Sequence, residues 1–89
     1  MPLLNEAELT RLNDTHPQWQ VEGDSMTRTF EFPDFVHAMA FVTRVALVAE
    51  KASHHPDIDV RWNRVTLTLS THSEGGLTEK DVALADELG

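Results

Sequence analysis

Two adjacent histidines end a long apolar segment of this chain, in the stretch Glu50-Lys51-Ala52-Ser53-His54-His55-Pro56. A third histidine, His72, closes a later segment of alternating polar and apolar residues, and Asp81 follows it. Histidine is the only side chain whose ordinary pKa lets it gain and lose a proton near neutral pH. Residues at the ends of regular elements often carry function. The pattern therefore predicts acid–base chemistry at His54, His55 and His72.

A metal site is the main alternative use of the three histidines, because histidine is the commonest metal ligand and three can hold zinc with an open position. Adjacent histidines seldom bind one ion, however, and neither a His-x-His nor a His-Glu-x-x-His spacing occurs. We therefore expect no metal. The two other histidines, His16 and His37, are expected to be solvated.

A small mixed fold must position these side chains. Asn5 with Glu8, and Thr78 with Asp81, have the spacing of capping boxes, and Asp34 is a suitable N-cap for the long apolar segment. Strands are predicted where apolar residues alternate, at 19–21, 26–32, 58–63 and 64–71. We predict one α+β domain, residues 1–89, in the order α-β-β-α-β-β-α, with a four-stranded antiparallel sheet and its helices on one face.

The last two strands predict where the histidines meet. A turn at Asn63-Arg64 would set Trp62 opposite Val65 and bring His55 level with His72. We therefore expect the three imidazoles to converge at one edge of the sheet. The same alternation places Trp62 on the face that packs against the core.

The central helix, residues 35–52, is more apolar than a surface helix needs to be. A surface helix requires about 100° of apolar arc. The few polar residues of this helix fall close to one stripe, and even that stripe contains an apolar residue, Leu47. We predict that a second subunit covers this helix in a homodimer or homotetramer; the alternative is a helix buried deeply in its own core. The polar residues of the segment are His37, Thr43, Arg44, Glu50 and Lys51.

Composition excludes several classes of function. The formal net charge is −8, from 15 acidic residues against 7 Lys and Arg, and no basic stripe is present to bind nucleic acid. There are no cysteines for disulfides or thiolate metal sites. No run approaches the roughly 20 apolar residues of a membrane span, and the N-terminal residues lack the pattern of a signal peptide. We expect a cytoplasmic protein without membrane or nucleic-acid partners.

The chain resembles the pterin-4a-carbinolamine dehydratases from Trp19 to its last helix. The residues that carry the resemblance are, in order, Glu50, His54-His55-Pro56, Trp62, His72 and Asp81, together with the segments at 41–47 and 67–72. Ser53 and Ser73 depart from the family, since many relatives carry an acid or amide at the first position and often glutamate at the second.

This resemblance implies a lyase that converts 4a-hydroxytetrahydropterin to quinonoid dihydropterin without metal or cofactor, in tetrahydrobiopterin biosynthesis and recycling. It implies tetramers assembled through the central helix. Expected substrate-binding residues, beside the catalytic His54, His55 and His72, are Ser53, Pro56, Ser70, Thr71 and Asp81. For Asp81 two roles stay open, the capping box and the orientation of His72. The rival function is a protein-binding regulatory module, similar to the dimerisation cofactors among the family's animal members.

Overall fold

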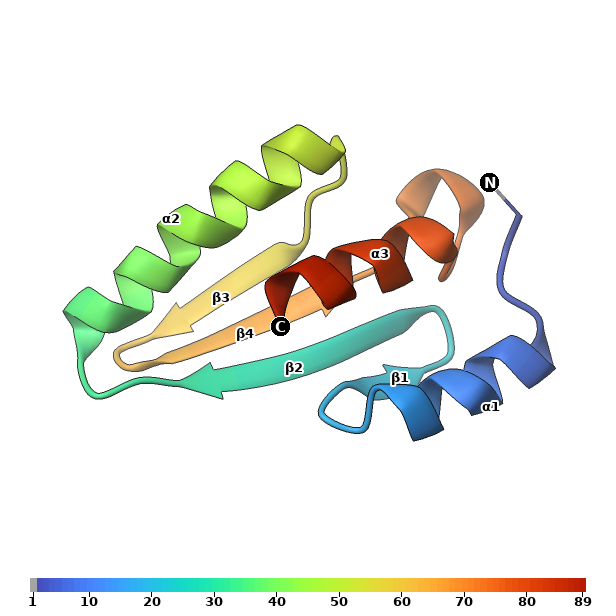
Figure 1. Ribbon diagram of the computed structural model, residues 1–89, viewed down its shortest axis with the longest axis horizontal. Helices are drawn as coiled ribbons and strands as arrows, with labels where there is room; N and C mark the ends of the chain where they lie inside the picture. Colours follow the sequence, from blue (N-terminus) through green and yellow to red (C-terminus); the bar gives the residue numbers. More distant parts are fainter. Residues whose placement is uncertain (1) are drawn as a thin grey trace.

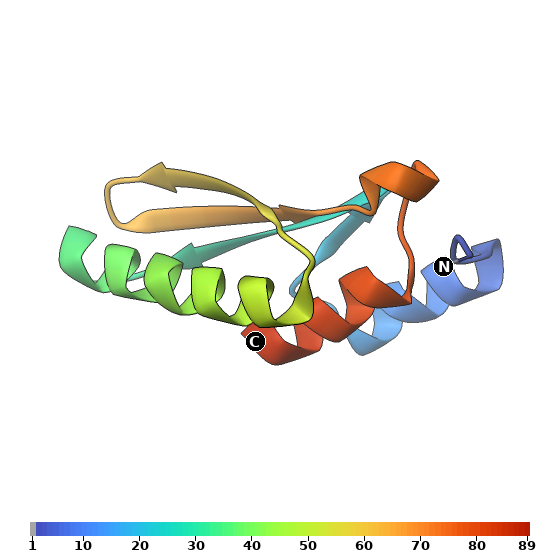
Figure 2. The ribbon, with the colours of Figure 1, turned by 90° about the horizontal axis from the view of Figure 1, so that it is seen from above.

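The computed structural model of the protein describes residues 2–89; Met1, the first residue of the predicted domain, lies outside them. One four-stranded antiparallel sheet, with strand order β1-β2-β4-β3, carries the helices on one face (Figures 1 and 2). The predicted order of elements and fold class are confirmed. The elements are α1 (Glu6–Thr15), β1 (Gln20–Glu22), β2 (Ser25–Glu31), α2 (Phe35–Ala52), β3 (Asp57–Arg61), β4 (Arg64–Leu69), the short 3₁₀ turn η1 (His72–Glu74) and α3 (Glu79–Leu88).

Both predicted capping boxes are present. The Asn5 side chain accepts a hydrogen bond from the Glu8 amide at 2.8 Å, and the Glu8 carboxylate accepts one from the Asn5 amide. At the start of α3, Thr78 and Asp81 form the equivalent pair. Each box satisfies amide groups that have no partner within the helix, so these two local sequences determine where α1 and α3 begin.

The central helix α2 begins and ends at polar residues. Asp34 caps its first turn by accepting a bond from the His37 amide at 2.9 Å, and this bond is the main reason why the pKa of the Asp34 carboxyl is lowered. His37 is largely exposed, as expected, and its ring contacts Asp34 at 2.7 Å. At the other end Ser53 adopts a left-handed conformation with φ 54°, which turns the chain out of the helix toward β3.

The β3–β4 hairpin differs from its predicted register by two residues. Arg61 pairs with Arg64, so the turn consists of Trp62 and Asn63. The reason is a tertiary contact: the Asn63 side-chain amide donates a hydrogen bond to the Phe32 carbonyl at 2.9 Å, and the Asn63 backbone carbonyl accepts one from the Phe32 amide at 2.9 Å. Trp62 is consequently not a core residue. It is 68% exposed at the hairpin tip, with φ 50°.

The core lies between the sheet and the helices. Alternate residues of β4, namely Val65, Leu67 and Leu69, are fully buried against them, whereas Thr66 and Thr68 face the open side of the sheet. The other buried apolar residues are Leu12, Trp19, Met26, Ala38, Val45, Ala49, Leu77, Leu84, Ala85 and Leu88. This packing holds the end of β4 beside the end of α2, where the candidate site lies.

One face of α2 remains uncovered within the single chain. Val36 is 74% exposed and Leu47 69% exposed, and Phe35 and Met39 are also exposed. The helix is therefore not buried deeply in its own core, and this apolar face is available to another protein surface. None of the helices formed by residues 2–89 combines the length and the apolar character needed to cross a bilayer.

Candidate active site

Two chain segments bring the three histidines of the sequence pattern to one hollow. His54 and His55 follow the left-handed turn at Ser53, and His72 begins η1 immediately beyond β4. The hollow has a volume of about 270 Å³. It is lined by Ser53, His54, His55, Ser70, Thr71, His72, Ser73 and Lys80. Of the expected site residues, Pro56 and Asp81 are absent from this lining.

The turn that follows β4, rather than the hairpin register, explains why His72 comes close although the predicted alignment was wrong. Asp57 pairs with Thr68, and continuing this ladder places His55 level with Ser70 rather than with His72. After Leu69 the chain leaves the ladder, and Thr71 forms an isolated bridge with Gly76. The resulting η1 turn places His72 on the wall of the hollow that His54 and His55 also line.

His54 is held by a buried carboxylate. Its Nε2 lies 2.5 Å from Oδ1 of Asp81, and its side chain is 12% exposed whereas that of Asp81 is completely buried. An ionised carboxylate only accepts hydrogen bonds, so we assign the proton in this contact to Nε2 of His54. Nδ1 is then the nitrogen left to exchange a proton with a bound molecule.

Asp81 is itself fixed by two further bonds. Its Oδ2 accepts from the Thr71 hydroxyl at 2.8 Å and from the Thr78 amide at 2.9 Å. The hydroxyls of Thr71 and Thr78 are also 2.8 Å apart. The capping box and a role at the histidines, which the sequence left as alternatives, therefore coexist in one carboxylate. The histidine that Asp81 contacts is His54, not His72. Because Asp81 is completely buried, its carboxylate does not reach a molecule in the hollow directly.

His55 has a carboxylate partner of its own. Its Nε2 lies 2.6 Å from Oε1 of Glu50, in the last turn of α2. Both side chains are mostly exposed, at 60% and 78%. Water screens such a pair, and its net contribution is about 0–1 kcal/mol. Glu50 therefore orients His55 far less firmly than Asp81 orients His54.

Three residues at this site were missed by the sequence analysis as site residues. Glu50 was only part of a family pattern, and the sequence offered no reason to connect it with His55 beyond their proximity. Lys80 and Ser73 line the hollow. Lys80 could have been found from its position beside Asp81 in the first turn of α3, because a side chain at that position can reach the hollow that the histidines line.

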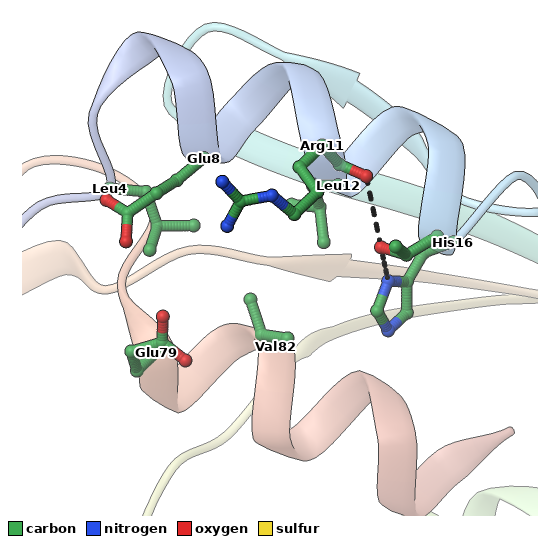
Figure 3. Close-up of a pocket in the computed structure, with 8 residues that line it drawn as sticks. Leu4, Glu8, Arg11, Leu12, His16, Glu79 and Val82 are labelled. Atoms are coloured by element: carbon green, nitrogen blue, oxygen red, sulfur yellow. Dashed lines mark hydrogen bonds between the residues drawn. The ribbon is translucent and has the colours of Figure 1, made fainter.

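The remaining histidine, His16, joins two helices instead of being solvated. Its side chain is 18% exposed, with Nε2 2.6 Å from Oδ1 of Asp86 and Nδ1 2.8 Å from the Thr15 hydroxyl. It lines a separate, smaller hollow of about 140 Å³ between α1 and α3 (Figure 3). The other residues lining it are Leu4, Glu8, Arg11, Leu12, Thr15, Glu79 and Val82. None of them lines the hollow of the three histidines.

Within residues 2–89, no three histidine, aspartate or glutamate side chains are grouped so that they could hold one metal ion. The two carboxylates at the site instead contact one imidazole each, Asp81 at His54 and Glu50 at His55. Carboxylate–imidazole pairs of this kind set the tautomer and orientation of the ring. The arrangement is suited to moving protons to and from a bound molecule.

The fold and the site together define an α+β protein with a three-histidine hollow at the end of an antiparallel sheet. The chain belongs to the pterin 4 alpha carbinolamine dehydratase family, whose model matches residues 2–89.

Individual relatives agree with this assignment. A Chloroflexus aurantiacus protein named "Putative pterin-4-alpha-carbinolamine dehydratase" is 55% identical over 85 residues, which cover 96% of this chain and 91% of the relative. A Thermomicrobium roseum protein with the same name is 51% identical over 88 residues, covering 99% and 95%.

Two solved structures share the fold. The transcriptional coactivator/pterin dehydratase from Brucella melitensis superimposes with a TM-score of 0.91 at 40% identity, covering 97% of this chain and 94% of that one. A pterin dehydratase-like protein described as a RuBisCO assembly factor in the alpha-carboxysome gives a TM-score of 0.65 at 24% identity, covering 79% and 81%. The second likeness concerns the fold alone.

Proposed function

We propose that this protein dehydrates a 4a-hydroxytetrahydropterin to quinonoid dihydropterin and water, as part of the recycling of a tetrahydropterin cofactor. The observation that carries the proposal is that three histidines from two chain segments line one hollow of about 270 Å³. Membership of the dehydratase family supports the choice of a pterin as the bound molecule.

The reaction needs one proton donor and one proton acceptor. Protonation of the 4a-hydroxyl lets the bond between C4a and oxygen break, and water leaves. Loss of the proton on N5 leaves an electron pair that forms the C4a–N5 double bond. A positioned acid or base contributes roughly 10²–10⁴-fold to such a step. No electron acceptor is required, because the substrate loses only the elements of water.

The site residues divide between these tasks. His54 and His72 share the acid and base roles, and His54 acts through Nδ1 because its Nε2 faces Asp81. His55 positions the substrate, since its carboxylate partner Glu50 is exposed and holds it weakly. The hydroxyls of Ser53, Ser70 and Thr71 and the chain direction set by Pro56 shape the binding surface. Asp81 is a positioning residue that acts through His54.

The direct test is a stopped assay that follows the loss of carbinolamine ultraviolet absorbance with and without a chelator. We expect the purified protein to accelerate the loss above the uncatalysed rate, to the same extent in both conditions, because only histidines supply the acid and the base. A rate equal to the uncatalysed one would contradict the proposed reaction. An acceleration that the chelator abolishes would contradict its mechanism.

We further propose that the apolar face of α2, formed by Phe35, Val36, Met39 and Leu47, is buried between copies of the chain. Removing apolar surface from water favours association by about 25 cal/mol for each Å² buried. The unit that associates is a single domain of residues 1–89 that acts in the cytoplasm on a small-molecule substrate. Its net charge of −8 disfavours nucleic acid as a partner.

Leu47→Glu should convert a dimer or tetramer into a smaller species in sedimentation equilibrium at micromolar concentration. Burying an unpaired carboxylate in an apolar interface costs more than the interface gains at that position. Lys51→Gln changes the charge by the same amount in the last turn of α2, outside the four residues of the apolar face, and should leave the assembly intact. A wild-type protein that is already monomeric would contradict the proposal.

A regulatory protein-binding module is the second candidate, since the same face could receive a different protein and the Brucella relative is described as a transcriptional coactivator as well as a dehydratase. The two functions make different demands on the histidines. A module needs the α2 face and not the imidazoles. Absence of dehydration together with a stable partner lost in Leu47→Glu would favour the module.

A further inference from the structure

A second hollow adjoins the three-histidine hollow and shares two of its residues. Ser70 and His72 line both. The second hollow has a volume of about 360 Å³. Its other lining residues are Asp24, Ser25, Asp57, Thr68 and Gly75. His72 is therefore a common wall between the candidate active site and a further space on the open side of the sheet.

Three strands, the turn between β1 and β2, and the η1 turn build this second hollow. Asp57 of β3 pairs directly with Thr68 of β4, and both side chains face away from the helices. Asp24 belongs to the turn between β1 and β2, and its carbonyl accepts a bond from the Ser70 hydroxyl at 2.7 Å. The turn is thereby fastened to the strand that leads to His72, so both hollows keep a fixed relation to one another.

The lining has an uneven charge. Asp24 and Asp57 contribute two carboxylates, and no lysine or arginine is among the lining residues. Among residues 2–89 neither carboxylate forms an ion pair. The hydroxyls of Ser25, Thr68 and Ser70 complete a surface that accepts hydrogen bonds from a donor and repels an anion.

The chemistry of the proposed substrate connects the two spaces. The reacting atoms of a 4a-hydroxytetrahydropterin are C4a and N5, and the ring atom next to N5 is C6, which carries the substituent that distinguishes one pterin from another. A histidine that exchanges a proton at either reacting atom therefore stands within a few bonds of that substituent. With His72 in this role, the substituent starts beside the common wall.

We propose, on the basis of the proposed dehydratase function, that the second hollow binds the C6 substituent and selects substrates whose substituent is neutral and hydroxylated. Asp24 and Asp57 are the specificity-determining residues. Hydroxyl groups donate hydrogen bonds to their carboxylates, whereas a phosphate or carboxylate on the substituent meets two like charges. Each like charge at about 4 Å in a solvated site reduces affinity about fivefold.

The test compares three carbinolamines, prepared from tetrahydropterins whose C6 substituent is methyl, dihydroxypropyl or phosphorylated hydroxymethyl. For the wild-type protein we expect a KM about tenfold lower for the dihydroxypropyl substrate than for the methyl one, because its hydroxyls bond to charged acceptors. The phosphorylated substrate should have a KM more than tenfold above that of the dihydroxypropyl substrate. Added salt should narrow this gap by screening the charges.

The double variant Asp24→Asn with Asp57→Asn should bring the KM values of the dihydroxypropyl and phosphorylated substrates within about threefold of each other. Asp59→Asn is the matched control: it removes a carboxylate from the same strand and face outside the hollow, and the wild-type preference should persist. Equal KM values for all three substrates in the wild type, or an unchanged preference in the double variant, would overturn the inference. Turnover of the methyl substrate separates the two proposals, since its absence would overturn the dehydratase function on which this inference rests.

Discussion

Replacing His54 or His72 by alanine should lower kcat for dehydration by about 10²–10⁴-fold each, which is the contribution of one positioned acid or base. Each substitution removes an imidazole from the hollow that both residues line. The measurement is the initial rate of carbinolamine loss at saturating substrate, with KM determined separately. His55→Ala should act mainly on KM, because the proposed role of His55 is to position the substrate.

The matched control is His37→Ala, which removes an exposed imidazole at the opposite end of α2. Its kcat should equal that of the wild type. The double variant of His54 and His72 should be little worse than the poorer single variant, since groups that act as one unit are not additive. If His54→Ala and His72→Ala both retained dehydration within a fewfold of the wild type, the assignment of the acid and base roles would be wrong.

Asp81→Asn should lower kcat by about 10²-fold or more while leaving all three histidines in place. The physical reason is the tautomer of His54. The asparagine oxygen can still accept from Thr71 and Thr78, which leaves the amide NH₂ facing Nε2 of His54. Nε2 must then accept a bond, the ring proton moves to Nδ1, and the neutral imidazole presents a donor where the wild type presents an acceptor.

In Asp81→Asn the loss of stability and the loss of catalytic rate can be measured separately. Loss of a charge-assisted bond at a fully buried position should cost about 1–3 kcal/mol of unfolding free energy, measured by urea unfolding. The rate is therefore compared well below the unfolding midpoint and across pH, because a change in the proton-bearing nitrogen alters the pH–rate profile whereas a simple loss of packing does not.

Two further substitutions place the Asp81 result in context. Glu50→Gln removes the exposed partner of His55 and should change the rate only a few-fold, since screened pairs contribute little. Asp86→Asn removes a carboxylate that lies on α3, as Asp81 does, but contacts His16 instead of His54, and this variant should leave kcat unchanged. A folded Asp81→Asn protein with wild-type kcat and an unaltered pH profile would show that Asp81 serves only as part of the helix cap.

The elements of the fold were predictable from local patterns. The capping boxes of α1 and α3 formed where the sequence placed them, and α2 spans the predicted range from Phe35 to Ala52. Capping and helical periodicity depend on residues three or four positions apart, so the local sequence is sufficient to predict where these helices lie. The sequence also predicted that His72 lies near His54 and His55. The ground for this prediction was general: two paired antiparallel strands bring together segments that are distant in the sequence.

The details that failed depend on contacts across the fold. The hairpin register was wrong by two residues because Asn63 bonds to the backbone of Phe32, which lies before α2. Trp62 consequently lies exposed at the turn rather than in the core. His16 was expected in solvent, yet it contacts Asp86, 70 positions away. Alternation of apolar residues reveals which face a strand buries, but not which long-range partner fixes its turn.

The sequence by itself determined the order of the elements, the three candidate imidazoles and the resemblance to one family, because these follow from residue type and from spacing along the chain. Only the tertiary structure decided which carboxylate meets which imidazole. Asp81 and His54 are 27 positions apart, and they meet because α3 packs beside the end of α2 on the same face of the sheet (Figure 2). That packing also buries Asp81 completely, and burial converts a helix-capping residue into one that can set the tautomer of His54.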